Sequence, residues 1–304
     1  MKIYQSIDDF SCTADTVVTI GTFDGVHEGH KIIIKRLIEI TKNESKESVL
    51  LTFSPHPRNV LFPEGDNLTL LNTDQEKIKQ LEELGIDHLI IQDFTKDFSR
   101  IKPVNFIRDI LINKLRMKYM IVGYDHHFGR NREGSFEELN NLSLLYSFSL
   151  ERVQAQVKNN ITISSTKIRN MLLNGDVKKA NMFLGKDYSI SGKVVHGEKI
   201  GRTIGFPTAN ILFEKNKLIP KCGVYVVKVI IDHVKHFGML NIDCNTHKLE
   251  VHIFNFSKDI YDKKITIKLI ERLRDNKKFD SLNELKSQLI KDKDNCNKFL
   301  ELKQ

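Results

Sequence analysis

The pattern of hydrophobic and polar positions changes once along the chain. Up to about residue 157, short β-branched and apolar runs alternate with segments whose apolar positions recur with a helical period. That alternation is typical of helices packed over a parallel sheet. The strands it predicts are Thr16–Ile20, Ser48–Phe53, His88–Ile91, Tyr119–Val122 and Leu150–Val157.

Helices are predicted between these strands, from an amphipathic stretch, two capping boxes and a proline suited to a first helical position. Two short helices, Ser165–Leu173 and Val177–Phe183, are predicted to close this half of the chain. The earlier helices begin near His30, Thr73, Pro103 and Ser135.

After Gly185 the pattern changes to β runs separated by Gly, Pro and Asn, which indicates a small antiparallel barrel. We therefore expect an α/β protein with two domains, residues 1–185 and 186–304. A chain of 304 residues is long enough for both to form their own cores. The elements predicted for the second domain are strands Tyr188–Val195, Tyr225–Ile231, Leu249–Phe256 and Ile265–Leu273, and a terminal helix from Ser281 to about Lys291.

The composition is ordinary for a globular protein, with 40% hydrophobic and 28% charged residues. No apolar run approaches the ~20 residues that a membrane span requires. The first twelve residues lack the features of a secretory signal, and the four cysteines have neither zinc-site nor disulfide-framework spacing. We expect a soluble, cytoplasmic protein with unpaired thiols and no membrane partner.

The net charge of +8 is unevenly distributed. Residues 1–183 carry 24 basic and 24 acidic side chains, whereas residues 184–304 carry 23 basic and 15 acidic ones. Lysines alternate with acids, Trp is absent, and no aromatic residues interleave a basic stripe. This pattern favours a solvated lysine-rich face over a nucleic-acid surface, and it leaves self-association open.

A motif directly after the first strand leads into a helix: Gly21-Thr22-Phe23-Asp24-Gly25-Val26-His27-Glu28-Gly29-His30. Ligands of open parallel sheets bind at the carboxyl ends of strands, where the next helix offers free N–H groups to a phosphate. His27 and His30 can both face such a phosphate and donate hydrogen bonds as charge develops on it. A structural histidine pair at a helix start is the alternative interpretation.

This string resembles the nucleotidyltransferase superfamily with the His-x-Gly-His signature, whose members transfer a nucleotidyl group and release pyrophosphate. Thr52–Pro57, Val122–Arg130 and Ile163–Arg169 narrow the resemblance to the bacterial bifunctional riboflavin kinase/FAD synthetase family. It implies a Rossmann-like FMN adenylyltransferase domain in which His27 and His30 are catalytic. By resemblance, the flavin is bound by His56, Asp125 and Phe128, and ATP by Gly21, Phe23, Asp24, Gly25, His27, His30, Ser164, Ser165, Thr166 and Arg169.

A second motif occupies Gly201–Asn210, and a later β run contains Glu250. A hydroxyl and an amide two residues apart can ligate magnesium beside a triphosphate, and a strand carboxylate can take a proton from an attacking hydroxyl. Taken singly, these residues also suit an ordinary turn and an exposed strand position. Together they resemble the six-stranded barrel of the riboflavin kinase module. That resemblance implies that Glu250 is the base, that Thr208 and Asn210 bind magnesium, and that ATP is bound by Gly201, Gly205, Pro207, Thr208 and Asn210.

One segment departs from the family. Members usually follow Gly-x-x-Asn-Ile with a Gly, an Arg-Pro-Thr turn and a longer loop. Here Gly238–Ile242 is followed by Asp243–His247, which lacks that Gly and Pro and is shorter. We expect a less complete lid and a weaker kinase module.

The sequence therefore predicts a bifunctional enzyme that phosphorylates riboflavin to FMN and adenylylates FMN to FAD, using ATP and Mg²⁺. Three alternatives stay open. The chain could be an FAD synthetase whose barrel binds flavin without kinase activity. It could be a nucleotidyltransferase for another acceptor, or a nucleic-acid-binding or regulatory protein.

Overall fold

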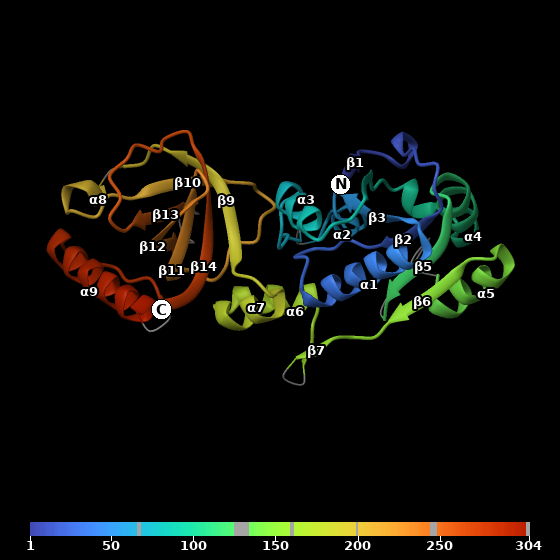
Figure 1. The fold of residues 1–304 in the computed structure, drawn as a ribbon. Coiled ribbons are helices and arrows are strands. Elements are labelled where there is room, and N and C mark those ends of the chain that lie inside the picture. The colour runs from blue at the N-terminus through green and yellow to red at the C-terminus, as the bar shows by residue number, and fades with distance from the viewer. Residues whose placement is uncertain (66–67, 125–133, 159–160, 199, 244–247, 302–304) are drawn as a thin grey trace. The chain divides into compact units, whose positions relative to one another are not determined.

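The computed structural model consists of two compact units, Met1–Ser165 and Thr166–Gln304 (Figure 1). The described residues are 1–65, 68–124, 134–158, 161–198, 200–243 and 248–301. The short helices α6 (Ser165–Leu173) and α7 (Val177–Leu184) largely belong to the second unit, since Asn181 Nδ2 donates to the carbonyl of Leu269 at 2.8 Å. The domain boundary near Gly185 stays a prediction.

The first unit is built on a parallel sheet of six strands in the order β1-β4-β3-β2-β5-β6. The interior strand β2 is wholly buried, as expected for a sheet covered on both faces. The edge strand β1 was not predicted, because three residues are too few to show a period. The strands are β1 (Lys2–Tyr4), β2 (Thr16–Ile20), β3 (Glu47–Ser54), β4 (His88–Asp93), β5 (Met117–Gly123) and β6 (Ser149–Val153).

The predicted strand Leu150–Val157 is too long. β6 ends at Val153, and Val157–Lys158 (β7) instead pairs antiparallel with Ile161–Thr162 (β8). Both pieces have β propensity, so the pattern alone cannot show where one strand ends.

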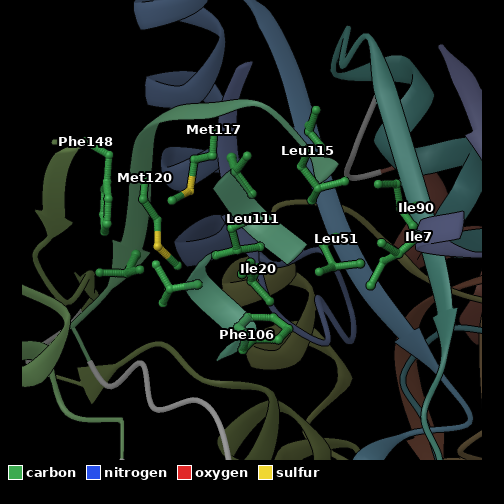
Figure 2. Close-up of a cluster of buried hydrophobic side chains, with 14 of the residues drawn as sticks. Ile7, Ile20, Leu51, Ile90, Phe106, Leu111, Leu115, Met117, Met120 and Phe148 are labelled. Atoms are coloured by element: carbon green, nitrogen blue, oxygen red, sulfur yellow. The ribbon is translucent and has the colours of Figure 1, made fainter. Parts of the chain in front are cut away.

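Helices cover both faces of this sheet. On one face, α1 (Glu28–Glu44) and α3 (Asp74–Glu83) pack through apolar side chains such as Ile34 and Leu81. On the other face lie α4 (Pro103–Asn105), the π-helical η3 (Phe106–Lys114) and α5 (Phe136–Tyr146). Figure 2 shows this second core, in which helical Phe106 and Leu111 lie against strand residues. The short helices η1 (Ile7–Asp9), α2 (Pro57–Leu61) and η2 (Phe98–Arg100) complete the unit.

The second unit is a closed antiparallel barrel in the order β10-β13-β12-β11-β14-β9, which confirms the expected barrel. β10 and β12 were not predicted from the hydrophobic pattern. β12 follows β11 through Asp232 and His233, both with positive φ (47° and 66°), where tight hairpins usually carry Asn-Gly. The elements are β9 (Tyr188–Val195), α8 (Ile200–Thr203), β10 (Ala209–Phe213), β11 (Gly223–Ile231), β12 (Val234–Asp243), β13 (Lys248–Ile253) and β14 (Lys264–Arg274).

The terminal helix α9 (Leu282–Glu301) packs on part of the outer face of the barrel (Figure 1). Its buried Cys296 joins an apolar cluster with Phe206 and Met239. The carboxylate of Asp292, which is 1% exposed, accepts hydrogen bonds from Arg274 Nε at 2.9 Å and from Arg274 Nη2 at 2.6 Å. The helix continues well beyond the predicted end near Lys291, because its last turns are mostly polar and carry little periodic signal.

Two expectations drawn from the composition concern membrane spans and the state of the cysteines. None of the described helices has both the length and the apolar character needed to cross a membrane. Cys222 is disulfide-bonded, whereas Cys12 and Cys296 are free thiols. The expectation of unpaired cysteines is therefore wrong for Cys222.

Candidate active sites

The order of strands in the first unit creates a switch point beside β2. From β2 the chain builds β3 and β4 on one side and then β5 and β6 on the other. In open α/β sheets, ligands bind outside the carboxyl ends of the strands at such a point. The Gly21–His30 motif follows β2, and the motif beginning at Val122 ends β5, so both lie at this edge.

Two imidazoles are stacked at the start of α1. The rings of His27 and His30 lie 3.6 Å apart between centroids with an interplanar angle of 15°. His27 is the N-cap residue, and its Nδ1 accepts a hydrogen bond from the backbone N–H of His30 at 3.3 Å. A Cβ atom on Gly29 would lie 3.2 Å from the His27 ring. The glycine therefore leaves room for the His27 ring over the helix backbone.

The loop before this helix is held in an unusual backbone conformation. Phe23, Gly25 and Val26 all have positive φ, at 47°, 89° and 41°. For the non-glycine residues Phe23 and Val26 this conformation costs free energy, and it persists where surrounding contacts enforce it, often at functional sites. Here the buried carboxylate of Asp24 accepts the N–H groups of Leu71 at 2.8 Å and of Asn72 at 3.3 Å. These bonds give the Asp24 carboxylate a role in fixing the loop.

The Ile163–Arg169 segment contacts this loop through a hydroxyl group. Ser165 Oγ donates to the carbonyl oxygen of Asp24 at 2.8 Å, and Ser164 precedes it in the same unit. Thr166 and Arg169 fall in the second unit, where Thr166 is exposed and Arg169 is buried. Their contact with ATP stays a prediction.

Of the residues predicted to bind flavin, His56 lies after β3 at the same edge of the sheet as the Gly21–His30 motif. It is the N-cap of α2, and its Nδ1 accepts a hydrogen bond from the backbone N–H of Arg58 at 3.1 Å. Asp125 and Phe128 lie outside the described residues.

In the second unit, the Gly201–Asn210 segment runs from α8 into β10 and forms a tight loop between them. The N–H of Phe206 donates to the carbonyl of Gly201 at 2.8 Å, and a Cβ atom on Gly201 would lie 2.2 Å from the carbonyl oxygen of Phe206. Gly205 has φ 86°. Thr208 Oγ1 lies 3.5 Å from that same Cβ position, so the loop holds the Thr208 hydroxyl beside Gly201. Only glycine fits the loop at Gly201.

Strand register places the metal and base candidates side by side. Asn210 on β10 is paired with Glu250 on β13, and Glu250 is paired on its other side with Asn241 on β12. Directly paired residues project from the same face with Cβ atoms about 5 Å apart. The predicted base and one predicted magnesium ligand thus adjoin, and Asn241 joins them. Asn241 belongs to the Gly-x-x-Asn-Ile motif, but the sequence alone assigned it no role.

The carboxylate of Glu250 is half-buried, and its surroundings raise its pKa. Burial is the largest cause, and the negative charges of Glu198 and Asp243 add to it, whereas Lys248 opposes it. Asp243, the first residue of the segment that departs from the family, therefore contributes a negative charge near Glu250, the predicted base.

His252 is a further site residue that the sequence did not single out. Its Nδ1 lies 2.8 Å from the carbonyl oxygen of Pro207, and because a carbonyl only accepts, Nδ1 carries the proton. The ring also lies 5.2 Å from that of Phe206, and burial lowers its pKa. His252 therefore ties the strand of Glu250, the predicted base, to the loop of Thr208. The sequence did offer one signal for His252. It stands two residues after Glu250, which places both residues on the same face of the strand.

Comparisons with known proteins match both units. A family model described as FAD synthetase matches residues 9–167, and one described as riboflavin kinase matches residues 184–300. Two relatives are named bifunctional riboflavin kinase/FMN adenylyltransferase. The relative from Buchnera aphidicola subsp. Acyrthosiphon pisum is 37% identical over 96% of each chain, and that from Escherichia coli strain K12 is 34% identical over 99% of each.

The chain belongs to this bifunctional family. A solved structure from Streptococcus pneumoniae, titled a macrolide-efflux protein, also resembles it, with a TM-score of 0.88 and 31% identity over 96% of this chain and 97% of that one. The resemblance inferred from the motifs, the α/β fold and the transferase class are thereby confirmed. These matches concern whole domains, so the roles of single residues stay predictions.

Proposed function

We propose that this family member makes FMN from riboflavin and ATP in its barrel, and FAD from FMN and ATP at the switch point of its parallel sheet. Domain content and relatives support the pair of activities. The observation that carries the residue assignments is that, within each unit, residues predicted to act together lie next to one another. Ser165 contacts the loop that ends in the stacked histidines, and Asn210 lies beside Glu250.

In adenylyl transfer, a phosphate oxygen of FMN attacks the α-phosphorus of ATP and pyrophosphate leaves. His27 and His30 stand at the helix N-terminus, where the dipole of α1 and free N–H groups favour negative charge. We assign them the role of donating hydrogen bonds to the α-phosphoryl oxygens as their charge grows. The glycines of the Gly21–Gly25 loop let the triphosphate approach the backbone.

In the kinase step, a ribityl hydroxyl of riboflavin attacks the γ-phosphorus of ATP and ADP leaves. Glu250 accepts the hydroxyl proton, a role that its raised pKa suits because a stronger base takes a proton more readily. His252 keeps the Pro207–Thr208 backbone in place.

Magnesium fits the same face of the barrel. The Thr208 hydroxyl, the Asn210 side-chain oxygen and the Glu250 carboxylate are the hard oxygen donors that Mg²⁺ prefers. Thr208 and Asn210 would hold the ion, which when bound neutralises the charge of the phosphates. We further assign the protein to the cytoplasm, with small-molecule substrates and without nucleic-acid or membrane partners.

Product analysis tests this proposal directly. Purified protein with riboflavin, ATP and Mg²⁺ should give FMN and then FAD by chromatography, and FMN with ATP should give FAD and pyrophosphate. If FAD forms from FMN while riboflavin is not consumed, the barrel is a flavin-binding domain only. If neither flavin is consumed, the acceptor is another phosphate.

A further inference from the structure

A second group of polar side chains lies at the opposite edge of the parallel sheet. Glu47 is the first residue of β3, His88 is the first residue of β4, and Cys12 lies in the segment just before β2. The nucleotide motifs follow the carboxyl ends of these strands. At about 3.3 Å per residue, the eight residues of β3 separate the two edges by about 23 Å. The group is thus distinct from the adenylyltransferase site.

The three side chains converge on one point. Cys12 Sγ lies 3.3 Å from Glu47 Oε2, and His88 Nε2 contacts the same carboxylate oxygen. The ligand atoms of all three residues lie within 4.8 Å of one another. His88 is 1% exposed and Cys12 is half-buried, so the cluster is partly shielded from water.

A hydrogen bond to the other ring nitrogen of His88 fixes the orientation of the ring. Its Nδ1 lies 3.1 Å from the hydroxyl of Tyr4 in the edge strand β1, which leaves Nε2 directed at Glu47 and Cys12. Histidines that bind metals almost always have such a partner on the other ring nitrogen, since it sets the tautomer and the ring angle.

The donor set identifies a class of ion. A thiolate, an imidazole nitrogen and a carboxylate oxygen are the three ligand types of zinc, with bond lengths of about 2.0–2.3 Å. Donors at those distances from one tetrahedral centre lie roughly 3.3–3.7 Å apart, which small side-chain adjustments within the cluster can reach. Magnesium and calcium prefer oxygen ligands alone and do not suit the sulfur.

We propose that Cys12, Glu47 and His88 bind a Zn²⁺ ion, with the fourth coordination position open to water. On binding, the Cys12 thiol gives up its proton to solvent and its sulfur forms the bond to zinc. The ion joins the segment before β2 to the starts of β3 and β4, and through Tyr4 it also holds β1. Its role is structural, fastening the N-terminal segment to the sheet.

Sequence spacing gave no sign of this site. Zinc motifs are recognised by ligands a few residues apart, whereas these three stand at positions 12, 47 and 88. Parallel strands bring their amino ends together, so the pairing of β3 with β4 places Glu47 and His88 next to each other.

Metal titration of the full-length protein tests the proposal. After removal of metal with a chelator, Zn²⁺ should bind with one site at this cluster by calorimetry and raise Tm. Co²⁺ should give the thiolate-to-metal absorption band that reports sulfur coordination. Cys12→Ser should abolish that band, whereas Cys296→Ser should retain it, because Cys296 is a free cysteine buried in the other unit.

Two milder variants keep the test decisive if Cys12→Ser does not fold. Glu47→Gln alters a side chain that is 43% exposed and should weaken zinc binding measurably. Tyr4→Phe removes the partner of His88 and should weaken it by about 10–100-fold. Absence of the cobalt band in the wild type, or equal Zn²⁺ affinity in wild type, Glu47→Gln and Tyr4→Phe, would overturn the proposal and leave a hydrogen-bonded cluster of side chains. These readouts do not depend on either flavin activity.

Discussion

At the scale of single residues, the imidazole of His27 has two tasks. Its Nδ1 caps the first turn of α1, and its ring stacks on His30. The cap bond engages Nδ1 and so orients the ring at the start of the helix. His30 is not the N-cap residue, so replacing it disturbs the helix start less and makes it the cleaner position for testing catalysis.

His30→Ala should lower FAD formation from FMN by ~10²–10³-fold, about 3–4 kcal/mol, because one preorganised donor to the α-phosphoryl group is lost. Steady-state kinetics with circular dichroism as the check on folding would measure it. Near-normal turnover in a folded variant would show that the histidine pair is structural.

Gly29→Ala tests the geometry of the pair without removing either imidazole. The new Cβ atom would lie 3.2 Å from the His27 ring, so the ring must move away. We expect FAD formation to fall while riboflavin phosphorylation is unchanged. Gly65→Ala is the matched control in the same unit, since its Cβ would meet an ordinary 3.5 Å contact. Equal rates for the two variants would contradict the proposed role of the stacked rings.

At the scale of elements, periodicity and capping signals predicted the secondary structure of most segments. The capping box of Thr73 and Glu76 is present, and five of the six strands of the parallel sheet were expected. The missed strands include β1, which is too short for a period, and β10 and β12, which lie beside turns without strong signals.

The sequence does not give the register of the strands, and the register determines which residues of the predicted kinase site are neighbours. The predictions included Asn210 and Glu250 as separate residues, but only the pairing of β10 with β13 makes them neighbours. Asn241 and His252 were missed because their contribution depends on the strands and loops opposite them.

The charges around β13 give a pH prediction. The negative charge of Asp243 raises the pKa of Glu250, so Asp243→Asn should lower it and let the base stay ionised in more acidic solution. The acidic limb of the kcat/KM profile for riboflavin phosphorylation should therefore move to lower pH. Lys248→Met removes a charge that lowers this pKa, so it should move the limb to higher pH. Two variants shifting in the same direction would rule out Glu250 as the titrating base.

At the scale of the whole molecule, the two activities are assigned to different stretches of chain. All the residues predicted for adenylyl transfer precede Gly185, and all those predicted for phosphorylation follow it. Family models divide in the same order, with residues 9–167 in one and 184–300 in the other. A change to the chemistry of one domain should then leave the other active.

Glu250→Gln should abolish conversion of riboflavin to FMN and leave conversion of supplied FMN to FAD nearly intact. Gln keeps the size and hydrogen bonding of the side chain but cannot accept the hydroxyl proton, which predicts a loss of ~10²–10⁴-fold. Because phosphoryl transfer relies mainly on positioning and on magnesium, Thr208→Ala is the necessary comparison and should be at least as damaging. Separate chromatographic assays with riboflavin and with FMN measure the two steps. Retained kinase activity in Glu250→Gln would remove the base assignment, and a parallel loss of both activities in a folded variant would show that the domains do not act independently.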